Sequence, residues 1–493
     1  MKTQINIQFC LTVAALSTAL LMASCKKDFL DVPPQAQQPE TAFWESAEDA
    51  GKAVNAIYAK LRSWDNVAFN AIVIESTGAD EADKGSTPTD ATFFNLFDNF
   101  TVTSTQGSLQ GFWNGQYQNI KLANQAIDSI PTITMDENLK SRYIAEAKFI
   151  RAYSYFRLVR AYGRVPLRLH EPKDASEYNL PQSESTEVYA QIEKDLAEAA
   201  AVLPPSYGAT DKGRATKGAA LGMHAKVAMY QKKWDQVLAL TNQVMGLGYD
   251  LFPNFEKGFR TENENNIESV FEIQSELLVG NAAASNSQYS QVQGVAGVTG
   301  GGWGFNSPSQ ALASAFEPGD PRRDATIIFR GETTPQGDVI PNSVPNERYN
   351  QKSYVPFSMR VSGYNEGAQQ NIRVIRFADV LLMNAEAANE LGNPAQAKSS
   401  LNRVRARARG GNPNILPDVT TNDKTELRNA VWHERQVELA MENDRYFDVI
   451  RQGRAPQIFG PKGWKANKNE VWPIPATEID LSGGKLTQNP GYN

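Results

Sequence analysis

Apolar residues recur at helical spacing along most of this chain. Between residues 143 and 162 they are separated by intervals of three and four, which is typical of one buried helical face. Two longer segments show this spacing twice with a short break: residues 220–245, interrupted at 231–233, and residues 377–408, interrupted by Gly-Asn-Pro at 392–394. Two helices of about 15 residues joined by a short turn are typical of a tetratricopeptide unit. The pattern therefore predicts a mostly α fold built from tetratricopeptide-like helix pairs.

Two loop-rich segments interrupt the helical pattern. The first, residues 64–105, separates a predicted helix at 47–62 from another at 117–130. The second, residues 251–372, is rich in Gly, Asn, Ser, Gln and Pro, which favour turns and loops. It contains two candidate strands, at residues 270–273 and 326–329. Because binding residues usually lie on loops that a rigid scaffold positions, we expect this mixed α/β insert and the first segment to form the ligand-binding side.

The N-terminus has the features of an export signal. Lys2 precedes an apolar or small stretch over residues 9–23, which is shorter than the roughly 20 residues that span a bilayer. The stretch ends at Ser24-Cys25 and polar residues follow, a pattern that resembles a bacterial lipoprotein box. We therefore predict a lipoprotein signal peptide at residues 1–24 and diacylation of Cys25, since two acyl chains anchor a protein stably. The alternative is an ordinary signal peptide with an incidental cysteine.

The rest of the chain is expected to form one integrated domain. Its helical N-terminal part covers residues 25–250, the insert covers residues 251–372, and a C-terminal helix pair with a terminal segment covers residues 373–493. A hydrophobic content of 41% over 493 residues is typical of a globular protein and excludes a disordered chain. The net charge of −6 and the lack of any basic block argue against a nucleic-acid partner.

Few residues are available for catalysis. Cys10 leaves with the predicted signal and Cys25 carries the predicted lipid, so no thiol remains. His170, His224 and His433 are scattered and lack the spacing of a zinc hydrolase or a catalytic triad. The 55 acidic residues leave room for a glycosidase pair of carboxylates, but the helical-repeat context counts against one. We therefore predict that the protein is not an enzyme.

Candidate ligand contacts lie in the two loop-rich segments. Sugars offer apolar C–H faces and hydroxyl groups, so a sugar site needs flat aromatic side chains beside polar ones. The predicted glycan-binding residues are Trp64, Asp65, Asn66, Asp80, Glu81, Tyr289, Trp303, Phe305 and Asn306. The alternative for each aromatic residue is packing of its loop against the scaffold. The acidic turn at 80–83 is either solvated or binds sugar hydroxyls or a structural Ca²⁺, and no other metal or cofactor is expected.

Motifs distributed along the chain resemble the SusD/RagB family of Bacteroidetes. They begin with Lys-Asp-Phe-Leu-Asp-Val-Pro-Pro shortly after Cys25 and continue, in order, through nearly the whole mature chain. The matching segments are residues 27–34, 145–156, 162–167, 319–323, 376–387, 401–405, 434–439, 445–451, 472–475 and 488–492. Because the order of the motifs is also that of the family, the chain is identified as a member by resemblance.

The resemblance implies a surface-exposed outer-membrane lipoprotein, anchored by its N-terminal lipid, whose helix pairs form a right-handed superhelical scaffold. Such proteins form a lid over a SusC-like TonB-dependent barrel, bind an oligosaccharide and pass it to the barrel for uptake, without catalysing a reaction. The alternatives are a RagB-like peptide binder and a structural or gating partner of the barrel that has no ligand of its own. The matched motifs are fold motifs, so no ligand contact is transferred from the family.

Overall fold

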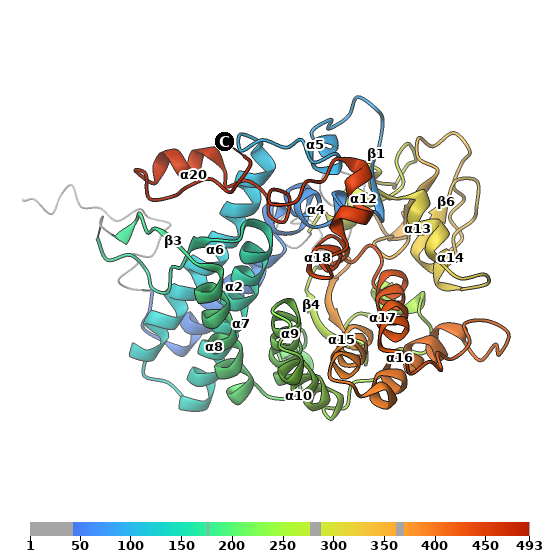
Figure 1. Ribbon diagram of the computed structural model, residues 1–493. Coiled ribbons are helices and arrows are strands. Elements are labelled where there is room, and N and C mark those ends of the chain that lie inside the picture. The colour runs from blue at the N-terminus through green and yellow to red at the C-terminus, as the bar shows by residue number, and fades with distance from the viewer. Residues whose placement is uncertain (1–42, 175–176, 277–286, 361–368, 493) are drawn as a thin grey trace, which may run out of the picture.

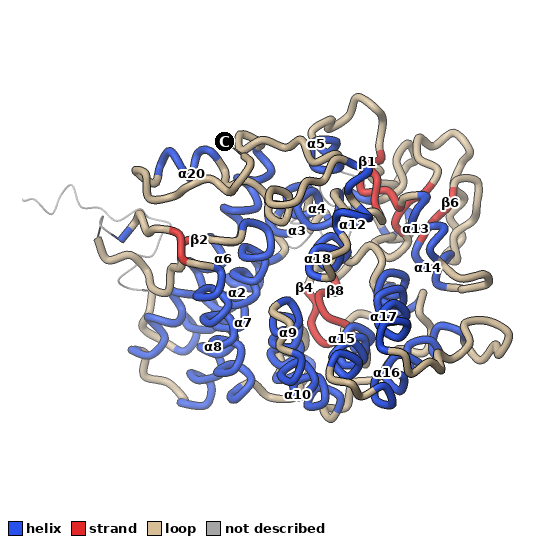
Figure 2. Tube along the Cα trace, in the orientation of Figure 1, coloured by secondary structure: helices blue, strands red, loops and turns tan. Residues whose placement is uncertain are grey.

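The computed structural model describes residues 43–174, 177–276, 287–360 and 369–492 (Figure 1). The predicted signal peptide at residues 1–24 and the predicted lipidation site Cys25 lie outside these residues. Within them, none of the helices is long and apolar enough to cross a membrane. Helices make up most of the described chain, and the strands are short (Figure 2).

Long helices build the N-terminal part of the protein. They are α2 (Ala47–Leu61), α6 (Gly107–Ser129), α7 (Glu137–Tyr162), α8 (Ser185–Val202), α9 (Lys217–Tyr230) and α10 (Trp234–Met245). From α6 to α10, each helix packs against the next one along the chain. α6 begins well before the predicted start at residue 117, because glycine and polar residues in its first turns hide the apolar periodicity. The helix α8 was not predicted from the sequence.

The C-terminal part repeats this arrangement. α15 (Phe377–Glu390) and α16 (Pro394–Arg409) form a helix pair, and α17 (Lys424–Glu438) packs against both. α10 packs against α15, so the helical scaffold is continuous across the insert (Figure 1). The short helices that follow are α18 (Arg445–Arg451), α19 (Ala455–Ile458) and α20 (Ala476–Leu481). The prediction of a mostly α fold made from tetratricopeptide-like helix pairs is confirmed.

Both loop-rich segments contain short regular elements. In the first they are α3 (Trp64–Val67), α4 (Phe69–Ile72), the π-helix η3 (Val73–Thr77), β1 (Ala82–Gly85) and α5 (Phe94–Asp98). In and beside the second they are β4 (Ser269–Ile273), α12 (Tyr289–Gln293), β5 (Phe305–Pro308), α13 (Gln310–Ala315), α14 (Arg322–Thr326), β6 (Ile327–Phe329), β7 (Arg348–Asn350) and β8 (Ile372–Arg376). The two predicted strands are therefore present, as β4 and β6.

The strands of the described residues pair as antiparallel two-stranded sheets (Figure 2). β2 (Val165–Pro166) pairs with β3 (Gln182–Ser183), β4 pairs with β8, and β6 pairs with β7. β1 pairs with β5, so that Ala82 lies opposite Pro308 and Gly85 lies opposite Phe305. The β1–β5 pair therefore joins the two loop-rich segments, which are far apart in the sequence.

One hydrophobic core contains residues from Ala50 to Tyr492. Near its C-terminal end Trp472 is fully buried and stacks on Tyr446, with 5.1 Å between the ring centroids. The indole Nε1 of Trp472 donates a hydrogen bond of 3.0 Å to the carbonyl oxygen of Ile74. A buried indole needs such an acceptor, because an unpaired N–H in the core is costly. The terminal segment is thereby fastened to η3, near the start of the scaffold.

A buried ionic network fixes the insert to the C-terminal helices. Glu438 on α17 accepts hydrogen bonds of 3.0 Å from Arg322 and from Arg376, and a further one from Arg407. Burial raises the pKa of Glu438, but these cationic neighbours outweigh burial and lower the pKa to about 2. Glu438 is therefore charged at neutral pH and neutralises guanidinium groups from three separate elements.

Candidate functional site

Trp64 and Trp303, predicted from separate loop-rich segments, lie side by side. Trp64 is the first residue of α3 and Trp303 lies just before β5, and their ring centroids are 6.0 Å apart. Phe69 on α4 contacts both rings, at 5.1 Å from Trp64 and 5.4 Å from Trp303. Phe93 adds a fourth ring, 6.3 Å from Phe69. These four half-buried residues, Trp64, Phe69, Phe93 and Trp303, form what we call the aromatic surface.

A buried layer holds the aromatic surface in place. Phe94 on α5 and Phe305 on β5 are buried and stack at 5.0 Å between ring centroids. Phe69 packs edge-on against Phe305 at 4.8 Å. Because β5 pairs with β1, this layer is tied to the backbone of the first loop-rich segment. The half-buried rings of the aromatic surface therefore rest on a packed support.

Asp65 follows Trp64 on α3, and its side chain lies against α6. Its carboxylate Oδ1 accepts a hydrogen bond of 2.8 Å from Asn70 Nδ2, and the side chain is half-buried. The helix α3, which contains Asp65, approaches α6 closely, since a Cβ atom added to Gly115 would lie 2.9 Å from the Cβ of Asp65. The glycine thus permits the close packing that positions Asp65 and Trp64.

The structure places four of the predicted contacts in the interior. Asn66 is fully buried, donates a hydrogen bond of 2.8 Å to the carbonyl oxygen of Lys60 and accepts one of 2.7 Å from Gln116. The other three buried residues are Tyr289, Phe305 and Asn306. The prediction that these residues contact a ligand at the surface is corrected, because their side chains pack against or bond with the protein itself. Of the four, Phe305 packs directly beneath the aromatic surface, against Phe69.

The acidic turn at residues 80–83 is part of the structural framework. Asp80 forms two hydrogen bonds of 2.7 Å with Arg445 of α18. Glu81 is buried and accepts a hydrogen bond of 3.1 Å from the backbone N–H of Met441. Burial raises the pKa of Glu81 to about 8, although Arg445 opposes this effect. Asp80 and Glu81 therefore tie the segment before β1 to the C-terminal part of the chain.

The histidines and acidic residues that the structure describes are not clustered as the ligands of a metal ion would be. No group of three His, Cys, Asp or Glu side chains among them is arranged to hold a metal ion. The three histidines also have separate partners: His170 lies 2.9 Å from Asp128, His224 lies 2.8 Å from Gln236, and His433 lies 3.7 Å from Glu317.

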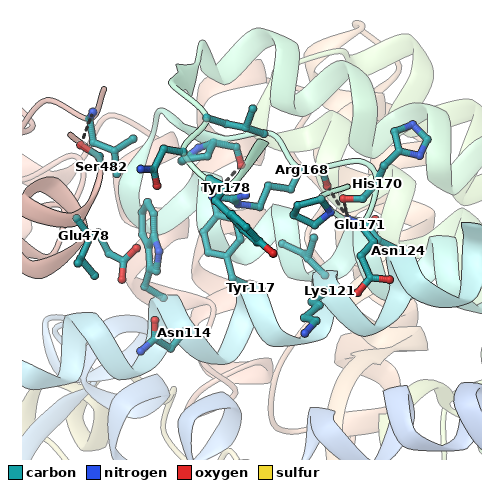
Figure 3. A pocket seen from close by; sticks show the side chains of 18 residues that line it. Asn114, Tyr117, Lys121, Asn124, Arg168, His170, Glu171, Tyr178, Glu478 and Ser482 are labelled. Carbon is teal, nitrogen blue, oxygen red and sulfur yellow. Dashed lines mark hydrogen bonds between the residues drawn. The ribbon is translucent and has the colours of Figure 1, made fainter. Parts of the chain in front are cut away.

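A cavity of about 350 Å³ lies between α6, the chain that follows α7, and the segment around α20 (Figure 3). Figure 3 shows Glu478 and Ser482 on one side of it and His170 and Glu171 on the other. The sequence analysis missed this cavity. A signal was present in α6, where the polar and aromatic residues Asn114, Tyr117, Lys121 and Asn124 recur at intervals of three and four. Such a stripe on a helix marks a surface that is neither core nor fully solvated.

Comparisons with known proteins agree with this fold. Residues 267–492 match a family model described as the SusD family, and residues 28–229 match one described as starch-binding associating with outer membrane. The chain is 28% identical over 501 residues to SusD-like protein P2 of Formosa agariphila, which covers 96% of this chain and 98% of that protein. It is 30% identical over 468 residues to a SusD-like protein of Bacteroides ovatus, which covers 88% of this chain and 81% of that protein.

Solved structures of similar proteins have the same architecture. A laminarin-binding SusD-like protein has a TM-score of 0.80 and 30% sequence identity, with 91% of this chain and 100% of that chain covered. Surface glycan-binding protein A from Bacteroides thetaiotaomicron, in complex with laminarihexaose, has a TM-score of 0.75 and 23% sequence identity, with 90% of this chain and 99% of that chain covered. At this level of identity, the likeness shows the fold alone. Family models match both halves of this chain, and a relative that is 30% identical covers 88% of it. This chain therefore belongs to the SusD/RagB family that its motifs indicated.

Proposed function

We propose that this protein binds neutral oligosaccharides at the aromatic surface and delivers them to a transporter. The observation that supports binding is the contact between Trp64 and Trp303, two half-exposed rings brought together from distant loops. Sugar rings present C–H faces to flat aromatic groups, and Asp65 lies beside Trp64 to accept hydrogen bonds from hydroxyl groups. The site is a binding surface and performs no reaction.

The ligand we propose is a neutral glucan of the laminarin type. The support is the laminarin-binding SusD-like protein, which shares 30% of its residues with this chain over its whole length. Among the predicted contacts, Asp80 is paired with Arg445 and Glu81 is buried, so Asp65 is the one carboxylate that is neither buried nor paired with a cation. An uncharged chain of sugars therefore suits this surface better than a strongly charged ligand.

We further propose that Cys25 carries a lipid that anchors the protein to the outer membrane, facing the cell exterior. The lipoprotein box supports the anchor, and a family model described as associating with the outer membrane supports the location. A SusC-like TonB-dependent barrel is the proposed partner that receives the bound glycan. The helix pairs offer the extended protein-binding surface that such a partner needs.

Titration calorimetry tests the binding proposal. The full chain with Cys25→Ala, which carries no lipid, is titrated with laminarihexaose, an anionic glycan and an oligopeptide. We expect binding of the neutral glycan, weakened about tenfold or more by Trp303→Ala or Trp64→Ala through loss of a stacking ring. Trp234→Ala is the matched control, because Trp234 is a half-buried tryptophan at the start of α10.

The other outcomes identify the alternatives. Binding of the peptide alone would indicate a RagB-like peptide binder. Absence of binding to any ligand, in protein with an intact thermal unfolding transition, would contradict the proposal and favour a structural role beside the barrel. Equal loss of affinity in the Trp234→Ala control would show that the tryptophan substitutions act through stability.

A further inference from the structure

The cavity beside α6 carries exposed apolar groups that the proposed function does not use. Tyr178 is 58% exposed and Leu481 is 67% exposed, and both line the cavity. With Val339 they are the three most exposed large hydrophobic side chains in the part of the chain that the structure describes. The cavity volume of about 350 Å³ lies within the range of roughly 300–1,000 Å³ found for small-molecule sites. Exposed apolar groups at the mouth of a cavity of this size favour a ligand.

The walls of the cavity are aromatic and well supported. Trp113 and Tyr117 on α6 pack together at 5.0 Å between ring centroids, and the Tyr117 hydroxyl donates a hydrogen bond of 2.7 Å to the carbonyl oxygen of Pro166. Arg168 donates hydrogen bonds to the carbonyl oxygens of Glu177 and Tyr178. These bonds hold the chain near Tyr178 against the cavity wall. A third ring is thus presented at the mouth.

The lining also contains polar groups with unused hydrogen-bonding capacity. Glu478 accepts a hydrogen bond of 2.5 Å from Gln110 through Oε1, and its Oε2 has no hydrogen-bond partner among the described residues. Asn114 accepts a bond of 2.9 Å from Gln110 through Oδ1, which leaves its amide N–H groups available to a ligand. Lys121 forms neither a hydrogen bond nor an ion pair with any described residue. The cavity therefore offers donors, an acceptor and aromatic rings together.

We propose that this cavity is a second carbohydrate site, which holds one end of a neutral oligosaccharide. Hydroxyl groups both donate and accept hydrogen bonds, so they suit the mixed set of Asn114, Lys121 and Glu478, and a sugar ring covers the exposed face of Tyr178. A ligand with a single strong charge is disfavoured, because Lys121 and Glu478 have opposite charges. This inference rests on the proposed function for its ligand class. It adds a site lined by residues of α6 other than Gly111 and Gly115, which face α3 and Asn70.

Titration of single and double variants with laminaritriose tests the second site. The full chain with Cys25→Ala is the starting protein, and each variant is compared with it. We expect Trp303→Ala to retain one binding event, and the added Tyr178→Ala substitution to weaken that event about tenfold. Val339→Ala is the control, because Val339 is 66% exposed and does not line the cavity. Since Tyr178 is exposed, its replacement is expected to leave the thermal unfolding midpoint unchanged.

The variants separate the two sites. If Tyr178→Ala leaves affinity unchanged in both backgrounds, the second site is refuted, while the effect of Trp303→Ala still tests the aromatic surface. If Tyr178→Ala removes binding and Trp303→Ala has no effect, the cavity is supported and the aromatic surface is refuted. Loss of binding to a detergent-solubilised barrel partner in Tyr178→Ala, with glycan affinity unchanged, would also overturn the inference and assign the exposed residues to a protein interface.

Discussion

Replacing Glu81 with glutamine tests whether this buried carboxyl is protonated in the folded protein. The side chain is 0% exposed, and burial raises its pKa from 4.5 to about 8, against the opposing effect of Arg445. In the unfolded chain the carboxyl loses its proton near pH 4.5, so between that pH and about 8 the folded form alone retains the proton. The resulting stabilisation is complete below pH 4.5 and is lost as the pH rises through about 8.

The magnitude follows from the interval between the two pKa values. At about 1.4 kcal/mol for each pH unit, the interval from 4.5 to about 8 corresponds to a change of about 5 kcal/mol in the free energy of unfolding. Glutamine keeps an oxygen that accepts the hydrogen bond from Met441 but does not titrate. The Glu81→Gln variant is therefore expected to become steadily more stable, relative to the wild type, as the pH is raised, by up to about 5 kcal/mol.

Urea unfolding followed by circular dichroism measures this difference. Midpoints are recorded from about pH 5 to about pH 8 at constant ionic strength, and the difference between variant and wild type isolates Glu81 from other titrating groups. Glu48→Gln is the control, because the Glu48 side chain on α2 is 76% exposed. Parallel pH profiles for Glu81→Gln and the wild type would refute the reasoning, since the carboxyl would then titrate alike in the folded and unfolded chains.

Two further predictions concern packing and charge. Glu438→Ala is expected to lower the free energy of unfolding by about 3–5 kcal/mol, because buried guanidinium groups lose their counter-ion. Glu426→Ala is the control, and it is expected to change the free energy of unfolding little because Glu426 lies at the exposed start of the same helix. Thermal and urea unfolding measure both variants, and equal effects would contradict the role of the network. In Gly115→Ala, the added Cβ meets Asp65 at 2.9 Å and displaces α3, which carries Trp64. This variant is expected to be less stable by about 1–3 kcal/mol and to bind the glycan severalfold more weakly. Gly107→Ala in the same helix is the control, since its Cβ meets nothing within 4 Å, and calorimetry that finds the two variants equal would contradict this positioning of Trp64.

Local periodicity predicted the helical scaffold well. The pairs α9–α10 and α15–α16 were visible in the sequence because apolar residues recur at helical spacing along them, although only α10 and α16 bury a single face and α9 and α15 are buried on nearly all sides. The helix α8 was missed although Val188, Ile192, Leu196 and Ala199 are buried at helical spacing along it. The periodic signal for α8 is therefore present in the sequence.

The candidate site was predicted only in part. Trp64 and Trp303 were correctly expected to lie in loop-rich sequence, and their contact depends on the pairing of β1 with β5, which no local pattern indicates. The cavity beside α6 depends on three segments that are distant in sequence, of which only the helix shows a recognisable stripe. Long-range contacts decided both features.

Helical periodicity and the order of the motifs can be read from the sequence alone, and they predicted the helix pairs and the family. The sequence did not determine which loop residues are available to a ligand. Trp64 and Asn66 are two positions apart, yet one reaches the surface and the other is fully buried beside Gln116. Burial is set by which distant segments pack together, and only the tertiary structure contains that information.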